Sequence, residues 1–261
     1  MRNDRIAAVV RKEWAMLRRQ KMVLRTAIGV PILITAIACG LLAIASLAPE
    51  RAAPGHELPA QLAQGAQSAR EGLMTMMSHL GVALLLLVPT IIPSMSATHS
   101  VIGEKQARTL EPLLATPLRT WELLTAKLVA CVVPGVIAGW ASAIAYAAVV
   151  FGVSSPHTAA RILSPTWVLS LGVLAPLMAV LAVVLSLAVS SRVNDVQSAQ
   201  AASVFVVLPV IGFGVSQTAG LLILSPAVLL GIIAVVAALD AGALALCVSL
   251  FERETVLTRW R

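Results

Sequence analysis

Charged side chains are scarce in this chain of 261 residues, and acidic ones are the scarcest. Asp and Glu together number 12 and Lys and Arg 19, so charged residues make up 12% of the chain, against roughly a quarter in soluble domains. Hydrophobic residues make up 59%. This composition excludes an ordinary soluble globular protein and indicates an integral membrane protein.

Several motifs of catalysis and ligand binding are also missing. The sequence contains no G-x-x-x-x-G-K-[ST] loop for nucleotide phosphates, no G-x-S-G and no paired glutamates of the kind that intramembrane enzymes use. Its three cysteines, Cys39, Cys131 and Cys247, lie far apart in apolar segments, which argues against a disulfide framework or a CxxC metal site. These absences argue against an enzyme and predict no catalytic residue, metal or cofactor on this chain.

Long apolar runs recur along the chain without the strand alternation that a membrane barrel needs. A helix needs about 20 residues to cross a hydrocarbon layer of about 30 Å. The sequence predicts six such helices, at Val23–Ala48, Leu73–Ser96, Leu128–Val153, Thr166–Ser190, Ala199–Val215 and Pro226–Leu250. The predicted fold is therefore an all-α membrane protein with one domain, in which 1–22 form a surface helix, 23–250 a six-span bundle and 251–261 a tail.

Basic residues orient these spans. With the N-terminus in the cytoplasm, the cytoplasmic segments hold Arg2, Arg5, Arg11, Lys12, Arg18, Arg19, Lys21, Arg25, Lys105, Arg108, Arg119, Lys127, Arg192, Arg253, Arg259 and Arg261. The outer segments keep only Arg51, Arg70 and Arg161. The positive-inside rule then predicts a multi-pass protein of the cytoplasmic membrane with both termini inside. The net charge of +7 follows from this topology, and we expect no nucleic-acid partner.

The segment before the first span has the pattern of an amphipathic helix lying on the inner membrane surface. One side of this helix carries Ile6, Val9, Val10, Trp14 and Leu17. Glu13 projects from the middle of that apolar side. Because an unpaired carboxylate is costly there, we expect a cation or amide donor from another cytoplasmic element to meet it. The alternative is a surface glutamate on a fraying helix.

A charged insert, Gly103–Pro117, separates the second and third spans. Pro112 suits the first turn of a brief helix and Pro117 its end. Such a helix would offer its leucines to a groove on a soluble partner, with charges around them. The residues proposed for this contact are Glu104, Arg108, Leu110, Glu111, Leu113 and Leu114. The alternative is a charged loop that only anchors the topology.

The order of residues in this insert resembles the E-K-E-x-x-T-L-E-x-L-L-x-T-P signature of ABC type 2 exporter permeases, although Gln106 stands at its second carboxylate. Three further segments resemble that family over most of the chain. They are Arg11-Lys12-Glu13 before the first span, Ser190-Ser191-Arg192 with Asp195 and Ala199, and Phe251-Glu252-Arg253-Glu254 with Leu257 and Trp260.

The resemblance implies a function and partners. It implies that Gly103–Pro117 is a cytoplasmic coupling helix between spans two and three that docks on a separate ATPase subunit, which binds ATP and Mg. It also implies that the N-terminal helix, with Glu13 and Trp14, is the connecting helix. Two permease protomers, expected to be identical, would then flank the path of an exported substrate. An ion-gradient-driven secondary transporter is the alternative that the residues leave open.

Polar residues at membrane depth are candidates for the substrate path. They are Asp240, Gln200, Gln217 and Tyr146. A carboxylate such as that of Asp240 costs about 3 kcal/mol at the membrane centre, so it should face protein or water. It would serve either as an ion or substrate contact or as a structural hydrogen bond or salt bridge, and interhelical hydrogen bonding explains the other three equally well.

Two further groups of residues in the spans have both a packing and a functional interpretation. Prolines in the spans predict kinks, any of which could also act as a gate: Pro89, Pro93, Pro134, Pro176 and Pro209. Thioether and imidazole groups that suit Cu(I) begin the second span, namely Met74, Met76, Met77 and His79. Since no second cluster completes a site, ordinary apolar packing by methionine is the better interpretation. Nothing in the sequence selects the transported molecule.

Overall fold

The structure, a computed structural model, describes residues 2–19, 21–48, 68–106, 120–192, 212 and 226–250. These residues form the helices α1 (Arg2–Arg19), α2 (Lys21–Ser46), α4 (Ala69–Gln106), α6 (Thr120–Val153), α7 (Pro156–Ile162), α8 (Pro165–Leu169), the π-helical η1 (Ser170–Leu174), α9 (Ala175–Arg192) and α11 (Pro226–Leu250). No strand occurs among them. The predicted tail, 251–261, lies outside the described residues.

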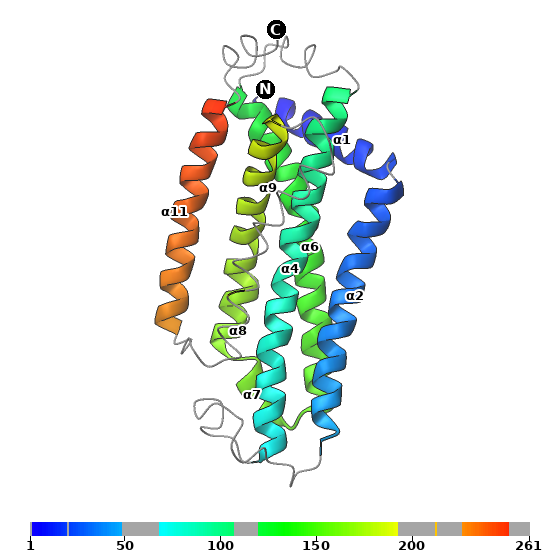
Figure 1. The fold of residues 1–261 in the computed structure, drawn as a ribbon, viewed down its shortest axis with the longest axis vertical. Coiled ribbons are helices and arrows are strands. Elements are labelled where there is room, and N and C mark those ends of the chain that lie inside the picture. The colour runs from blue at the N-terminus through cyan, green and yellow to red at the C-terminus, as the bar shows by residue number, and fades with distance from the viewer. Residues whose placement is uncertain are drawn as a thin grey trace.

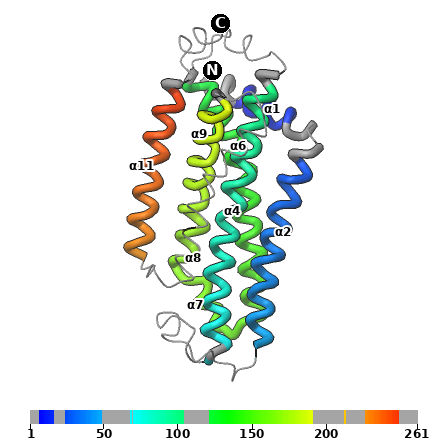
Figure 2. Tube along the Cα trace, viewed as in Figure 1, coloured from blue at the N-terminus to red at the C-terminus, as the bar shows by residue number. Residues whose placement is uncertain are grey.

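The long helices form an elongated bundle around α4, which contacts α2, α6 and α9 (Figure 1). Helix α11 packs mainly on α9 and stands at one side of the bundle (Figure 2). Helix α1 crosses one end of the bundle and contacts α6 and α2, while the short α7 lies at the opposite end. These two ends are called the α1 end and the α7 end below.

Five helical segments of the described chain are long and apolar enough to cross a membrane. They correspond to the first four and the last of the predicted spans, whereas the predicted fifth span, Ala199–Val215, lies outside the described residues. The bundle is therefore helical and multi-pass in the part that the structure describes. A sixth span stays a prediction.

Helix boundaries differ from the predicted spans at the α1 end. The second span was expected to end at Ser96, but α4 continues to Gln106, and α6 begins at Thr120 instead of Leu128. With 38 residues, α4 is about 57 Å long at 1.5 Å per residue, well beyond a hydrocarbon layer of about 30 Å. A helix that packs on its neighbours does not stop where the lipid stops. The first residues of the Gly103–Pro117 insert are consequently the last turn of α4.

Buried apolar residues form two clusters, one towards each end of the bundle. The α7-end cluster includes Leu42, Met74, Leu85, Tyr146, Leu174 and Leu229. The α1-end cluster includes Ala97, Val101, Leu124, Cys131, Val183, Leu187 and Cys247. Both clusters draw on α4, α6, α9 and α11, so the four helices share two apolar layers. Met74 lies inside one of them, as expected for a methionine that fills apolar space.

Between these layers, α4 and α6 pack through prolines on one helix and glycines on the other. A Cβ added to Gly139 would lie 3.2 Å from Cδ of Pro89, and one added to Gly135 would overlap the Pro93 ring. The two glycines are four positions apart and so share one face of α6, a spacing of small residues that allows close helix packing in membranes. Large side chains are thereby kept out of the middle of this interface.

Candidate functional site

Glu13 of α1 lies in a buried polar cluster with one residue each from α4 and α6. Its Oε1 lies 3.0 Å from Nζ of Lys127, and its Oε2 accepts a hydrogen bond of 2.8 Å from the Ser100 hydroxyl. The Lys127 ammonium also donates to the Ser100 hydroxyl oxygen at 2.6 Å. Both charged side chains are only 2–3% exposed. The expectation that a cation meets Glu13 is confirmed, and the alternative of a surface glutamate is wrong.

Trp14, the next residue of α1, makes a second contact with α6. Its indole Nε1 donates to the Ala130 carbonyl at 3.0 Å. In an uninterrupted helix the amide of residue 134 would bond to that carbonyl, but Pro134 has no N–H to donate. Trp14 therefore satisfies a carbonyl that the proline has freed. Through Glu13 and Trp14, α1 is bonded both to the side chains of the bundle and to the backbone of α6 where Pro134 interrupts its ladder.

A related arrangement occurs further along the chain, where η1 widens the fourth span. The amide of Ala175 donates to the Ser170 carbonyl, five residues back, instead of to the Leu171 carbonyl, four residues back. The next amide in the π pattern would be that of Pro176, which has none. The indole of Trp140 donates to the Leu171 carbonyl at 3.1 Å. The predicted irregularity at Pro176 is thus a π-helical segment whose free carbonyl is satisfied by α6.

The residues proposed for ATPase contact are only partly described. Glu104 belongs to the last turn of α4, whereas Arg108, Leu110, Glu111, Leu113 and Leu114 lie outside the described residues. The insert 107–119 joins the α1 ends of α4 and α6, the two helices that hold Glu13. Its attachment points are therefore fixed to α1 through the Glu13 cluster.

The candidate path residues do not come together in the described structure. Tyr146 is fully buried in the α7-end cluster, where its ring and hydroxyl lie against Gly81 of α4; a Cβ there would be 2.9 Å from the phenolic oxygen. This position gives Tyr146 a packing role, and a role in transport stays a prediction. Gln200 and Gln217 lie outside the described residues.

Asp240 lies on the buried side of α11 and is 9% exposed. The salt bridge or structural hydrogen bond considered for it does not involve its Oδ1, which is buried and has no hydrogen-bond partner among the described residues. Among the described residues, no donor supports a structural interpretation at this oxygen, and a role in transport stays a prediction.

An ionic cluster at the α7 end was not predicted from the sequence. The buried carboxylate of Glu71, in the first turn of α4, lies 2.8 Å from Nδ1 of His157 and 3.5 Å from Nη1 of Arg161. Both partners belong to α7. Next to Glu71, the Arg70 side chain donates to the Ala48 carbonyl beyond α2 at 2.7 Å. The only available signal was a glutamate just before a predicted span, so its α7 partners could not be identified.

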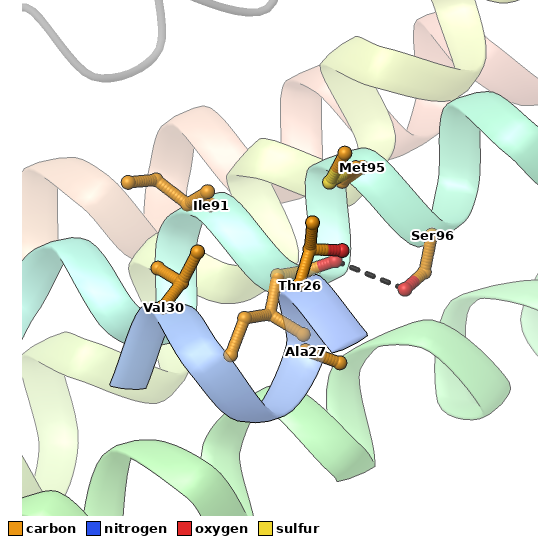
Figure 3. Close-up of a pocket in the computed structure, with 7 residues that line it drawn as sticks. Thr26, Ala27, Val30, Ile91, Met95 and Ser96 are labelled. Atoms are coloured by element: carbon orange, nitrogen blue, oxygen red, sulfur yellow. Dashed lines mark hydrogen bonds between the residues drawn. The ribbon is translucent and has the colours of Figure 1, made fainter. Parts of the chain in front are cut away.

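A shallow groove opens between α2 and α4 near the α1 end (Figure 3). It is lined by Thr26, Ala27, Val30, Ile91, Ile92, Met95 and Ser96. The Ser96 hydroxyl donates to the Ile92 carbonyl of its own helix at 3.0 Å, which leaves the groove mainly apolar. None of the predicted path residues lines it.

Comparison with known proteins agrees with the helical membrane architecture. The family model described as "ABC-2 family transporter protein" matches residues 7–239, from the first half of α1 into α11. No curated protein and no solved structure matches the chain. The match spans most of the chain and includes Glu13, Ser100 and Lys127. The chain therefore belongs to the ABC-2 transporter family and is a membrane permease subunit of an ABC transporter.

Proposed function

We propose that this permease is the membrane half of an ATP-driven exporter in the cytoplasmic membrane, with its α1 end in the cytoplasm. The distribution of basic residues supports this orientation, because Lys and Arg are concentrated in α1, at the start of α2 and around the 107–119 insert. A separate subunit binds ATP and Mg, and the chain itself carries no P-loop sequence. Two copies of the permease enclose the path.

The observation that carries the proposal is the attachment of α1 to α4 and α6. Glu13, Ser100 and Lys127 join the three helices at the end where the insert connects α4 to α6. A force applied to the insert therefore acts on the two helices to which α1 is bonded. Closure of the ATPase dimer would move insert and α1 together and tilt the spans from inward-facing to outward-facing.

Trp14 connects the movement of α1 to the backbone of α6. A proline interrupts the hydrogen-bond ladder of α6 at Ala130, and helices bend most readily at such interruptions. Because Trp14 donates to that carbonyl, displacement of α1 would break or lengthen this hydrogen bond at the position where Pro134 has already removed the helical one. We infer that the Pro134 region is the joint through which α1 acts.

The test is assembly with a cognate ATPase subunit, sought first in the genes adjacent to that of the permease. Leu113→Ala and Glu111→Gln in the insert should each reduce both the co-purified ATPase and its hydrolysis rate in nanodiscs, since a few central contacts carry most of an interface's binding energy. Leu230→Ala is the matched control, because Leu230 is 53% exposed and lies in the part of α11 near the α7 end. Unaltered assembly and hydrolysis in both insert variants would contradict the proposal.

The alternative function, a secondary transporter, differs from an ATP-driven exporter in its energy source. Inside-out vesicles that hold the permease and its ATPase should accumulate substrate only when ATP is supplied. Transport without ATP, driven by a proton or sodium gradient, would instead establish a secondary transporter.

A further inference from the structure

A middle layer lies between the two apolar clusters. On α4 and α6 it includes the close contacts of Pro89 and Pro93 with Gly139 and Gly135, and also the buried side chains of Val88, Ile92 and Val136. On α9 the residues between the clusters include Ala179 and Ala182, both fully buried. The buried face of α9 is thus lined by small side chains at this level. Small residues alone do not make a site, but a carboxylate shares this level.

Asp240 occupies this level on α11. On one side of it Leu229 and Val236 belong to the α7-end cluster, and on the other Cys247 belongs to the α1-end cluster. Along the buried side of α11, Asp240 therefore lies between the residues of one cluster and those of the other. Its side chain is more than nine-tenths buried, and its Oδ1 has no hydrogen-bond partner in the described part of the chain.

The other acidic residues in the described membrane-spanning segments have partners. Glu71 contacts His157 and Arg161, and Glu122 likewise interacts with other groups. Asp240 differs from them in its depth as well, because Glu71 and Glu122 each lie in the first turn of their helix and Asp240 lies mid-span. A buried carboxylate oxygen without a donor calls for a positive partner.

The helix that faces Asp240 supplies no such partner. Between Ala175 and Ser191, α9 contains only apolar residues and serines, and Arg192 stands at its far end. The described membrane-spanning segments contain three basic residues, namely Arg25 and Arg70 at the ends of their spans and Lys127, which is paired with Glu13. A cation that meets Asp240 must therefore come from outside the described bundle.

We propose that Asp240 binds the positive charge of a cationic, otherwise apolar substrate in the middle layer. The inference rests on the proposed export function and names the class of its cargo: a lipophilic monovalent cation, whose apolar groups pack against the small residues of α9 while its charge pairs with the carboxylate. Among the described helices α11 packs mainly on α9, so the cation would lie between these two helices.

The first experiment measures binding of tetraphenylphosphonium to the full-length permease in nanodiscs, with empty nanodiscs as the lipid background. Asp240→Asn should lower its affinity about tenfold or more, the effect of losing about 1.4 kcal/mol. Asp240→Glu, which keeps the charge, should remain close to the wild type. Triphenylphosphine oxide, a neutral relative of the probe, should bind equally to wild type and Asp240→Asn. Equal tetraphenylphosphonium affinity in wild type and Asp240→Asn, or no binding above empty nanodiscs, would overturn the proposal.

A second measurement uses the wild-type protein alone, in case a variant does not fold. Dicyclohexylcarbodiimide reacts with carboxyl groups in apolar surroundings, and the modified peptide containing Asp240 can be quantified by mass spectrometry. Tetraphenylphosphonium should slow this reaction and the neutral oxide should not; equal rates with and without the cation would refute the site. Neither measurement needs ATP or the ATPase. A failure here leaves the export function standing, whereas failed assembly with the ATPase leaves these binding results intact.

Discussion

The indole of Trp14 donates its hydrogen bond to the Ala130 carbonyl, the acceptor that Pro134 leaves without its helical donor. The proline and the tryptophan therefore depend on each other through this one carbonyl. Without the proline, the carbonyl would be occupied by the helix. Without the tryptophan, a carbonyl close to the membrane would remain unsatisfied, which is costly in lipid.

Replacement of this tryptophan tests the relationship directly. Trp14→Phe keeps an aromatic ring but removes the donor, and should destabilise the protein by about 1–3 kcal/mol because the carbonyl is left without a partner. Pro134→Ala restores an amide to the α6 ladder, so the double variant Trp14→Phe with Pro134→Ala should lose much less than Trp14→Phe alone. Thermal unfolding of the four proteins in detergent measures the coupling. Additive effects of the two substitutions would contradict it.

The buried Glu13 and Lys127 pair predicts strong coupling as well. Glu13→Gln or Lys127→Met alone leaves one buried charge uncompensated and should cost about 3–5 kcal/mol. The double variant removes both charges and should be less destabilised than the sum of the single variants. Arg11→Gln, an exposed change on the same helix, is the matched control and should shift the unfolding midpoint little. Equal losses for Arg11→Gln and Lys127→Met would rule out a special role for the pair.

Packing between α4 and α6 predicts a graded response to added methyl groups. Gly135→Ala places a Cβ inside the Pro93 ring and should destabilise by about 1–3 kcal/mol, as overpacking does. Gly139→Ala meets Pro89 at 3.2–3.3 Å and should be milder. Gly29→Ala in α2 has no heavy atom within 4 Å of the new Cβ and should be neutral or slightly stabilising. Urea or thermal unfolding gives the order, and a Gly29 variant as damaging as that of Gly135 would refute the packing.

The Trp140 indole predicts a local effect at η1. Trp140→Phe removes the donor to the Leu171 carbonyl, so backbone amides around η1 should exchange with deuterium faster while those of α2 keep their rates. Trp167→Phe is the comparison, because the Trp167 indole nitrogen makes no hydrogen bond in the described structure. Hydrogen exchange read by mass spectrometry reports both regions. Unchanged exchange at η1 would show that the bond is dispensable.

Much of the architecture was predictable because apolar length and charge act locally along the chain. Runs such as Pro226–Leu250 must be helices in lipid, and the structure has a helix with the same bounds. Helix ends were less predictable. Hydropathy marks where lipid stops, while α4 continues to Gln106 because it packs on other helices at the α1 end.

The candidate site shows the same division. The sequence by itself determined that Glu13, a carboxylate on an apolar helix face, needed a positive partner, since its burial is unfavourable without one. Only the tertiary structure decided that this partner is Lys127, 114 positions away, and that Trp14 reaches a carbonyl 116 positions away. Such pairings follow from how the helices cross. Local sequence patterns contain no information on that crossing, because it is fixed by the packing of all the helices together.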